Sequence, residues 1–226
     1  ARFYPYRILV SHEIVNDTIN GERVLVTYCP LCFTGIVFDP LVDQERVEFG
    51  VSGKLRNSNL IMYDRKTNSL WSQVTGEAIV GEQTGSQLAI VPSDITKFGL
   101  FAEAHSSGEV LSRDTGRPFA SYNSVPYGGD LTDIPPFFPL SHKDNRLPET
   151  AYVLGVVLDD ATKAYHFDAV KQAGSFTDTI GDTAVQVAYE ADTDSVTITS
   201  AGERVPAIPA FWFSWVATHP ETELYK

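Results

Sequence analysis

Short apolar runs of strand length recur along the whole chain of 226 residues and are separated by turns rich in Asp, Gly and Asn. Alternating or continuous apolar positions over a few residues are typical of β-strands, whereas amphipathic helices repeat every three to four residues. The runs that fit the strand pattern are residues 23–28, 35–38, 46–51, 58–63, 87–91, 152–158, 184–189 and 195–199. The pattern therefore predicts a mainly β protein.

Two segments depart from the strand pattern and predict short helices. Ser93 is a suitable N-cap for a helix over residues 94–105, and a second helix over residues 209–218 begins with a proline, which suits a first turn. His105 and His219 lie at the ends of these two segments, where a protonated imidazole would favour the negative end of the helix dipole.

The chain matches itself at two constant offsets. Tyr28 matches Tyr189 at an offset of 161 residues, and His105 matches His219 at an offset of 114. The difference between the offsets predicts a duplicated β-rich module whose first copy carries about 47 extra residues.

The duplication divides the chain into three parts. Residues 1–112 form the first module, with the Cys-Pro-Leu-Cys sequence and the inserted segment, and residues 162–226 form the second, shorter module. Residues 113–161 are rich in Pro and Gly and predict an ordered connection that ends in a hairpin strand. We expect the two related modules to pack as one compact unit, because 43% hydrophobic residues are enough for a sizeable core.

The start of the chain lacks one element that the second module has. There, a strand over residues 163–167 follows the apolar run 152–158 and a short turn, which is the spacing of a hairpin. Ala1 corresponds to the end of that turn. We therefore expect a longer precursor to supply the corresponding strand, since residues 2–6 would otherwise form an open sheet edge.

The composition restricts the partners of the protein. The net charge of −12 opposes binding to nucleic acid or to anionic lipid. No run of about 18 apolar residues occurs, so no transmembrane segment is expected. A homo-oligomer or a partner at the cell surface stays open, and the substrate, if there is a small-molecule one, is unknown.

The only two cysteines, Cys29 and Cys32, occupy one turn between two strand-like runs. A strand that brings two thiols into a tight turn directs both sulfurs to a common point, which suits a soft metal ion, a disulfide or a redox dithiol. At the offset of 161 the cysteines correspond to Glu190 and Thr193, so only the first module carries this chemistry.

Among metals, copper(I) fits the turn best. Two thiolates are too few for a closed zinc site, whereas copper(I) accepts two or three sulfur and nitrogen ligands. We predict His12 as a third ligand and Met62 as a weaker candidate, because a lone Met in a strand usually packs in a core. Copper is the expected cofactor, with zinc or no cofactor as alternatives.

Four residues of the inserted segment combine polar and aromatic character: Asp64, Arg65, Trp71 and Gln73. They are candidates for a pocket beside the thiols or for groups that orient metal ligands. Asp64 and Arg65 also fit a surface ion pair of little energetic weight. The sequence has no phosphate loop, nucleophile elbow, His-Glu-x-x-His motif or dinucleotide fingerprint, so catalytic residues are unknown and enzymatic activity is uncertain.

Several uncommon motifs together resemble a bacterial and archaeal family, the domain of unknown function 3179. The resemblance extends over essentially the whole chain and includes Ser-His-Glu-Ile-Val-Asn-Asp, Thr-Tyr-Cys-Pro-Leu-Cys, Phe-Gly-Val-Ser-Gly-Lys-Leu, Ser-Leu-Trp-Ser-Gln and Phe-Trp-Phe-Ser-Trp. It implies proteins that are often exported or lipid-anchored, but no function. Phe33 departs from the small residue that is common at its position, which narrows access to the turn.

We predict an extracytoplasmic metal-binding protein, periplasmic or extracellular, with copper at Cys29, Cys32 and His12. The first alternative is a structural or interaction protein of the cell surface with a Cys29–Cys32 disulfide. The second is a thiol oxidoreductase, which is less favoured because a redox Cys-x-x-Cys usually begins a helix, whereas a strand-like run follows Cys32.

Overall fold

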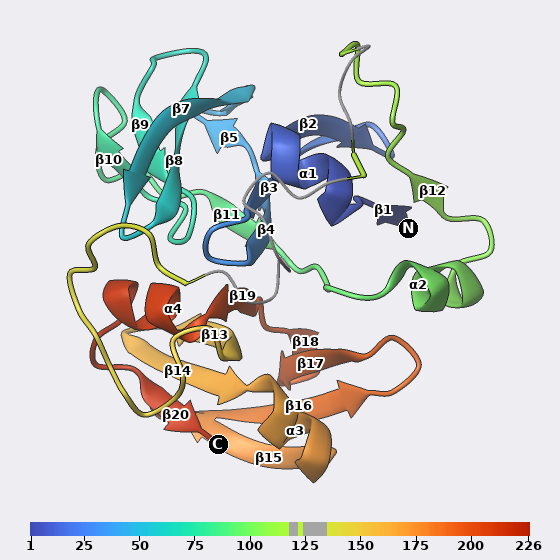
Figure 1. The fold of residues 1–226 in the computed structure, drawn as a ribbon, viewed down its shortest axis with the longest axis vertical. Helices are drawn as coiled ribbons and strands as arrows, with labels where there is room; N and C mark the ends of the chain where they lie inside the picture. The colour runs from blue at the N-terminus through green and yellow to red at the C-terminus, as the bar shows by residue number, and fades with distance from the viewer. Residues whose placement is uncertain (118–121, 124–134) are drawn as a thin grey trace.

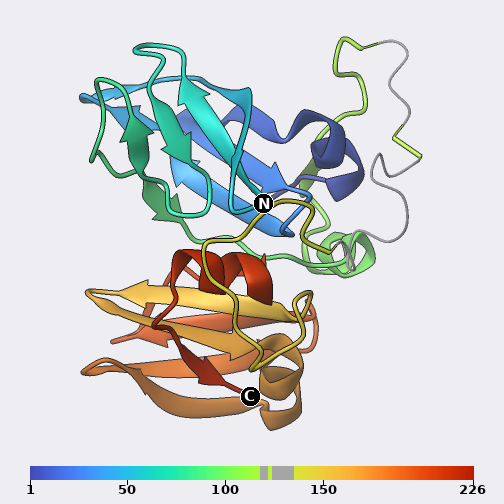
Figure 2. The ribbon, with the colours of Figure 1, turned by 60° about the vertical axis from the view of Figure 1, so that its left-hand side comes forward.

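The computed structural model describes residues 1–117, 122–123 and 135–226, and in this part the chain forms two lobes of β-sheets with short helices (Figures 1 and 2). The predicted mainly β fold is confirmed. Residues 118–121 and 124–134 of the predicted connection lie outside the described residues. None of the helices in the described ranges is long and apolar enough to cross a membrane.

The first lobe contains two antiparallel four-stranded sheets, ordered β11-β4-β3-β2 and β10-β9-β8-β7, and two small strand pairs, β1–β12 and β5–β6. Its strands are β1 (Arg2–Phe3), β2 (Ile14–Ile19), β3 (Glu22–Cys29), β4 (Thr34–Asp39), β5 (Leu41–Val42), β6 (Glu45–Arg46), β7 (Phe49–Arg56), β8 (Asn59–Asp64), β9 (Leu70–Ser72), β10 (Ala78–Val80), β11 (Ala89–Val91) and β12 (Glu109–Val110). Its helices are α1 (Tyr6–His12) and α2 (Phe98–Ala104).

The second lobe is built from two further four-stranded sheets, ordered β19-β13-β14-β20 and β15-β16-β17-β18. Its strands are β13 (Tyr152–Leu158), β14 (Ala161–His166), β15 (Ser175–Ile180), β16 (Thr183–Glu190), β17 (Ser195–Ser200), β18 (Glu203–Arg204), β19 (Ile208–Phe211) and β20 (Glu223–Tyr225). Helix α3 (Phe167–Ala173) follows β14, and α4 (Trp212–Thr218) lies between the lobes (Figure 1).

The two lobes repeat the same elements at the offsets seen in the sequence. The bounds of α1, β2, β3 and β4 differ from those of α3, β15, β16 and β17 by 161 residues, and the bounds of α2 and α4 differ by 114. Strands β5 to β10 come between these two series in the first lobe. A common origin by duplication stays a prediction.

Both predicted helices are shorter than the sequence pattern indicated. α2 begins at Phe98, and α4 begins at Trp212 because the preceding residues form the buried edge strand β19, where Pro209 lies opposite Leu154. An edge strand accepts a proline, since its missing N–H need not bond to a neighbour.

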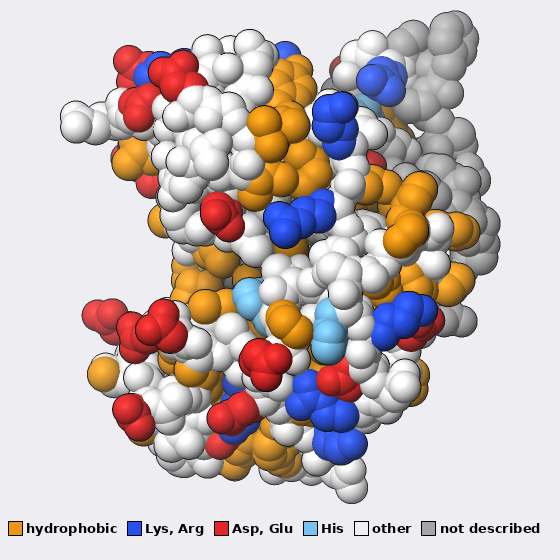
Figure 3. Space-filling view, turned by 90° about the vertical axis from the view of Figure 1, so that its left-hand side faces the viewer, with side chains coloured by type: hydrophobic (Ala, Val, Ile, Leu, Met, Phe, Trp, Pro, Cys, Tyr) orange, Lys and Arg blue, Asp and Glu red, His pale blue; other side chains and the backbone are white. Residues whose placement is uncertain are grey.

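One core cluster connects the lobes. Trp212, Phe213 and Trp215 of α4 pack in the same buried cluster as both cysteines of the first lobe. An indentation between the lobes also exposes hydrophobic side chains on one face, while acidic and basic side chains occur on both lobes (Figure 3). The lobes are therefore parts of one packed unit.

Candidate functional site: a buried thiol pair

The two cysteines lie at the turn between β3 and β4. Cys29 pairs with Thr34 across the hairpin, and the amide of Cys32 donates to the carbonyl oxygen of Cys29 at 3.4 Å. Phe33 has a φ of 55°, a left-handed conformation that turns the chain into β4. Both thiols are free, and the residues are only 1% and 0% exposed.

The sulfur of Cys32 accepts two hydrogen bonds from neutral side chains. Thr34 Oγ1 and Asn59 Nδ2 each lie 3.1 Å from Cys32 Sγ. Cys29 Sγ instead donates to the carbonyl oxygen of Ser58 at 3.6 Å. Ser58, in the turn between β7 and β8, and Asn59, at the start of β8, thus supply partners to the two thiols.

A second layer of hydrogen bonds orients Asn59. Its Nδ2 also donates to Gln73 Oε1 at 2.8 Å, and its Oδ1 accepts from the amide of Val74 at 3.1 Å. Gln73 Nε2 in turn donates to Thr27 Oγ1 and to the carbonyl oxygen of Thr34, both at 3.0 Å. Because these side chains are buried, the network fixes the amide that faces Cys32.

The second lobe completes the site. The amide of Phe211 donates to the carbonyl oxygen of Cys32 at 2.9 Å. The buried hydroxyl of Ser214, on α4, lowers the pKa of Cys32, although it has no hydrogen bond of normal geometry among the described residues. The thiol pair therefore lies where the β3–β4 turn, the inserted sheet and α4 meet.

The two thiols differ in acidity. Burial raises the pKa of Cys29 well above its usual value, and the neighbouring Cys32 sulfur raises it further. Burial also raises the pKa of Cys32, but the neighbouring Cys29 thiol, the hydrogen bonds from Thr34 and Asn59 and the nearby Ser214 hydroxyl outweigh it and hold that pKa below its usual value. Cys32 is therefore the more acidic and Cys29 the less acidic thiol of the pair.

The candidate residues of the inserted segment lie in three different places. Gln73 belongs to the thiol network, and Met62 lies fully buried in the same core cluster as the cysteines. Trp71 Nε1 donates to the buried Asp64 at 2.9 Å, so these two residues stabilise the β8–β9 turn. Arg65 is half exposed and lies over the ring of Tyr63 at 5.5 Å.

His12 makes its contact elsewhere. Its Nε2 lies 2.7 Å from the hydroxyl of Tyr122, and partial burial, with the charge of Arg117, lowers its pKa. Within the described ranges, no group of three or more His, Cys, Asp or Glu side chains is arranged to hold a metal ion. The role of His12 as a third ligand stays a prediction.

Sequence reasoning missed Thr34, Asn59 and Ser214. Asn59 carried a weak signal, because it is a polar residue at a buried position of an otherwise apolar strand. Ser214 stands similarly among buried aromatic residues of α4. Buried polar side chains need hydrogen-bond partners, so such positions indicate a network even when the partner is not known.

Phe33 connects the thiol turn to an aromatic cavity of about 430 Å³. Its ring stacks on Phe211 with centroids 5.4 Å apart and meets Tyr6 and Tyr152 edge-on, each at 5.5 Å. All four rings line this cavity between the lobes. The side chain next to Cys32 in the sequence therefore closes the cavity on the side of the thiols.

The first testable prediction concerns the acidity of Cys32. Thr34→Val keeps the shape of the side chain but removes a donor to Cys32 Sγ, so the pKa of Cys32 should rise. The thiolate absorbance in the ultraviolet, followed against pH, measures this shift. Thr34→Ser keeps the hydroxyl and should titrate like the unaltered protein; identical curves for Val and Ser would contradict the role of the Thr34 hydroxyl in the acidity of Cys32.

The fold and the site define a mainly β protein of two lobes with a buried Cys-x-x-Cys thiol pair. The family model described as "Protein of unknown function (DUF3179)" matches residues 1–202, which is most of the chain, so the protein belongs to this family. The family resemblance of the sequence is thereby confirmed. No curated protein and no solved structure was found to match.

Proposed function

We propose that the protein binds one copper(I) ion between Cys29 Sγ and Cys32 Sγ. The observation that carries this proposal is the pair of free, buried thiols on one turn, of which Cys32 has a pKa that its hydrogen-bond donors hold below the usual value. Thiolates are the soft ligands that copper(I) prefers, and two of them suffice for a low coordination number.

The charge balance of the site supports a bound cation. A buried thiolate is costly unless a positive charge or hydrogen bonds compensate it. The groups that lower the pKa of Cys32 are the neutral side chains of Thr34, Asn59 and Ser214, together with the Cys29 thiol. A cation bound to the sulfur would supply the charge that these donors do not carry.

Binding would release the protons that the two thiols carry. Cys29 Sγ donates its proton to the carbonyl oxygen of Ser58, and Cys32 is the more acidic thiol. Coordination of copper(I) by both sulfurs would displace these protons to water and leave a two-thiolate complex with one negative charge. The hydrogen bonds from Thr34 and Asn59 then stabilise that charge, as groups around metal-bound thiolates generally do.

The second prediction tests this proposal. Reduced protein titrated without oxygen against a chromophoric copper(I) chelator should take up about one equivalent of copper(I), and Cys29→Ser with Cys32→Ser should abolish this uptake. Thermal unfolding of each variant checks that the fold persists. An unchanged stoichiometry in the double variant would end the proposal.

The variant His12→Ala distinguishes a site with two ligands from the site with three ligands that the sequence predicts. Because the imidazole of His12 is bonded to Tyr122, the two-thiolate site predicts an unchanged affinity for copper(I). A weaker affinity in this variant would favour His12 as the third ligand. Tight binding of zinc with the same two cysteines would instead contradict the choice of copper.

A dithiol redox function is the second candidate, and the opposite pKa shifts of the two cysteines favour it. A thiolate beside a thiol can attack a disulfide and be resolved by its neighbour, with two electrons passing to the oxidised partner. Strand β4, rather than a helix, follows the turn, and both thiols are buried, which makes attack on a protein disulfide slow. Equilibration with glutathione, followed by a count of free thiols, tests it.

The proposed location is outside the cytoplasm, as the family resemblance implies. Fractionation of cells that produce the full-length protein, with detection in the exported fraction, would support it. Detection in the cytoplasm alone would contradict it.

A further inference from the structure

Within the described ranges, the first lobe has an apolar face that no strand covers. A groove of about 320 Å³ opens over the sheet that contains β2, β3, β4 and β11, between β1 and the segment of residues 94–97. Eight of the residues that line it are Tyr4, Leu9, Ile19, Val24, Val26, Gly35, Val37 and Val91.

The counterparts of these eight residues lie in a closed hydrophobic core in the second lobe. At the offsets of 161 and 114 they correspond to eight members of the second lobe's own core cluster, which are Tyr165, Val170, Ile180, Val185, Val187, Val196, Ile198 and Val205. That cluster has ten buried members, and the remaining two are Leu154 and Val156 of β13. The side chains that cover the face in the second lobe therefore come from one strand.

Burial of three of these positions differs between the lobes in the way that a missing strand predicts. Ile180, Val185 and Ile198 are each 1% exposed, whereas their counterparts in the first lobe are only partly buried. Leu9 and Val26 are buried, as are their counterparts in the second lobe. Sequence cannot account for the difference at the three positions, because a large apolar residue stands at each of them in both lobes. What differs, in the part of the chain that the structure describes, is the strand above them.

The two edges of the groove are the counterparts of the neighbours of β13. In the second lobe β13 pairs with β14 on one side and with β19 on the other, antiparallel to both. β14 corresponds to β1 at the offset of 161, and β19 corresponds to residues 94–97 at the offset of 114. The first lobe therefore contains counterparts of both neighbours of β13.

Strand β1 has backbone hydrogen-bonding groups on both of its sides, one of which faces the groove. The carbonyl oxygens of Ala1 and Phe3 accept hydrogen bonds from the amides of Glu109 and Leu111, on the β12 side. Since successive backbone groups of a strand alternate in direction, those of Arg2 and Tyr4 point to the opposite side, which is the groove.

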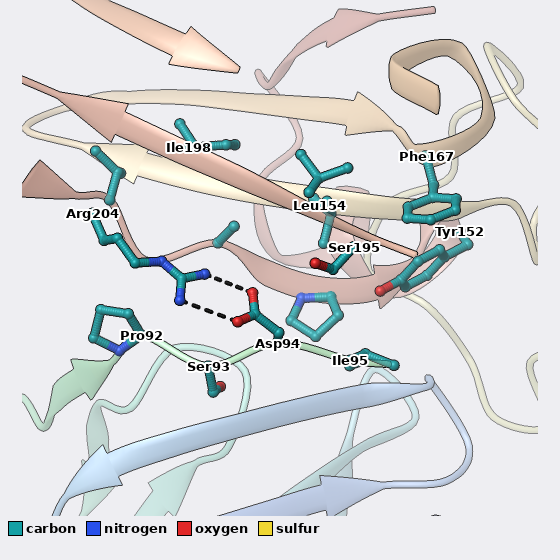
Figure 4. Close-up of a pocket in the computed structure, with 14 residues that line it drawn as sticks. Pro92, Ser93, Asp94, Ile95, Tyr152, Leu154, Phe167, Ser195, Ile198 and Arg204 are labelled. Atoms are coloured by element: carbon teal, nitrogen blue, oxygen red, sulfur yellow. Dashed lines mark hydrogen bonds and ion pairs between the residues drawn. The ribbon is translucent and has the colours of Figure 1, made fainter. Parts of the chain in front are cut away.

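Ion pairs and hydrogen bonds hold the two walls in place. Figure 4 shows Asp94 turned toward Arg204 of the second lobe, and the two oxygens of Asp94 lie 2.6 and 3.1 Å from the guanidinium nitrogens. On the other wall, Arg2 and Tyr4 both bond to Asp17 at 2.7 Å. These contacts join one wall of the groove to β2 and the other to the second lobe.

We propose that this groove takes one extended apolar β-strand, antiparallel to β1, in the position that β13 has in the second lobe. The strand that we commit to is a segment of the same polypeptide outside residues 1–226. β13 reaches its place through a two-residue turn from β14, so a local connection already serves this position once in the chain.

The side chains of the groove define the chemistry of the strand. About seven residues fill the length of β13, and alternate positions equivalent to Leu154 and Val156 must be apolar to cover the sheet. Main-chain hydrogen bonds to β1 supply affinity, while the apolar positions supply selectivity.

The third prediction uses a synthetic strand as the probe. A labelled peptide that copies residues 152–158, with lysines at both ends for solubility, should bind residues 1–226 with a stoichiometry of one, measured by fluorescence anisotropy. The same peptide with Asp in place of Leu154 and Val156 should bind at least about tenfold more weakly, because carboxylates would face the apolar sheet. Equal binding of both peptides, or none by either, would overturn the proposal.

A protein variant and amide exchange provide independent controls. Val37→Asp places a charge in the groove and should weaken binding of the probe, whereas Val80→Asp, on the exposed part of β10, should not. Should Val37→Asp fail to fold, hydrogen exchange on the unaltered chain still decides the matter. The amides of Arg2 and Tyr4 should exchange more slowly when the probe is bound, and an unchanged rate counts against strand pairing.

The full-length natural protein decides the source of the strand. It should not bind the probe, and its amides at Arg2 and Tyr4 should be protected from hydrogen exchange without added peptide. A natural protein whose intact mass begins at Ala1, or a longer one that binds the probe as well as residues 1–226 do, would overturn the assignment to the same polypeptide. Dimers of residues 1–226 that the probe dissociates would assign the groove to a second copy instead.

Discussion

The free energy of unfolding should fall by up to about 3 kcal/mol between pH 7 and pH 4 because of one residue, His219. Burial lowers the pKa of this histidine from 6.5 to about 4, and its Nε2 has no hydrogen-bond partner among the described residues. In the unfolded chain the same imidazole takes up a proton near pH 6.5. Between these two values the unfolded state binds more protons than the folded state, so stability decreases as the pH falls through this window.

Urea unfolding at a series of pH values measures this effect, and a variant isolates it. His219→Gln removes the titrating group and should flatten the dependence between pH 6.5 and 4, although it also loses contacts with Trp215. His105→Gln is the matched control, because His105 is exposed at the corresponding end of α2. Parallel curves for the unaltered protein and His219→Gln would contradict the prediction.

His219 also corrects one expectation from the sequence. Its position at the end of a helix suggested a protonated imidazole at the negative end of the dipole. The residue does cap α4, but burial keeps its imidazole neutral at pH 7, so that a favourable charge–dipole interaction is absent there. The cost of desolvation outweighs the attraction of the helix end.

Trp71→Ala should destabilise the protein by about 3–5 kcal/mol, the largest effect that we expect from a single substitution. Trp71 is 1% exposed and packs edge-on against Phe49 with centroids 5.6 Å apart. Its loss leaves a cavity and also removes the indole donor of Asp64, a carboxylate that is 0% exposed. A buried charge without one of its donors adds to the cost.

The variant Trp71→Phe separates the contribution of the cavity from that of the lost hydrogen bond to Asp64. The ring of Phe retains most of the apolar contacts but cannot donate to Asp64, so we expect a loss of about 1–3 kcal/mol. Urea denaturation at pH 7 measures both variants, with Val80→Asp as a surface control that should change little. Equal losses for Ala and Phe would refute the cavity contribution.

Much of the β-structure could be predicted from the sequence, and the exceptions have a physical cause. The run 152–158 coincides with β13, because this strand is buried on both faces and reads as continuous apolar sequence. β2 and β15 were missed, since their polar residues face solvent and leave only a weak alternation. α1 was also missed, because its seven residues are too few for a clear helical period.

Only the part of the candidate site that lies within one short stretch of sequence could be predicted. The thiol pair follows from the spacing of Cys29 and Cys32 in one turn. Asn59 and Ser214, which help to set the acidity of Cys32, come from segments far away in the sequence, and only the packing of the inserted sheet and α4 brings them to the sulfur. Gln73 belongs to the hydrogen-bond network beside the thiols, whereas Asp64 and Trp71 stabilise a turn, and the roles predicted for these residues at a metal site stay predictions.

The assembly of the thiol site from three parts of the chain sets an order of events during synthesis. The ribosome makes Cys29 and Cys32 well before Phe211 and Ser214, which lie much later in the chain. Until α4 docks, the nascent protein lacks the side chains that bury the thiols in the shared core. The cysteines are therefore open to reagents, oxidants and metal ions until α4 closes the site.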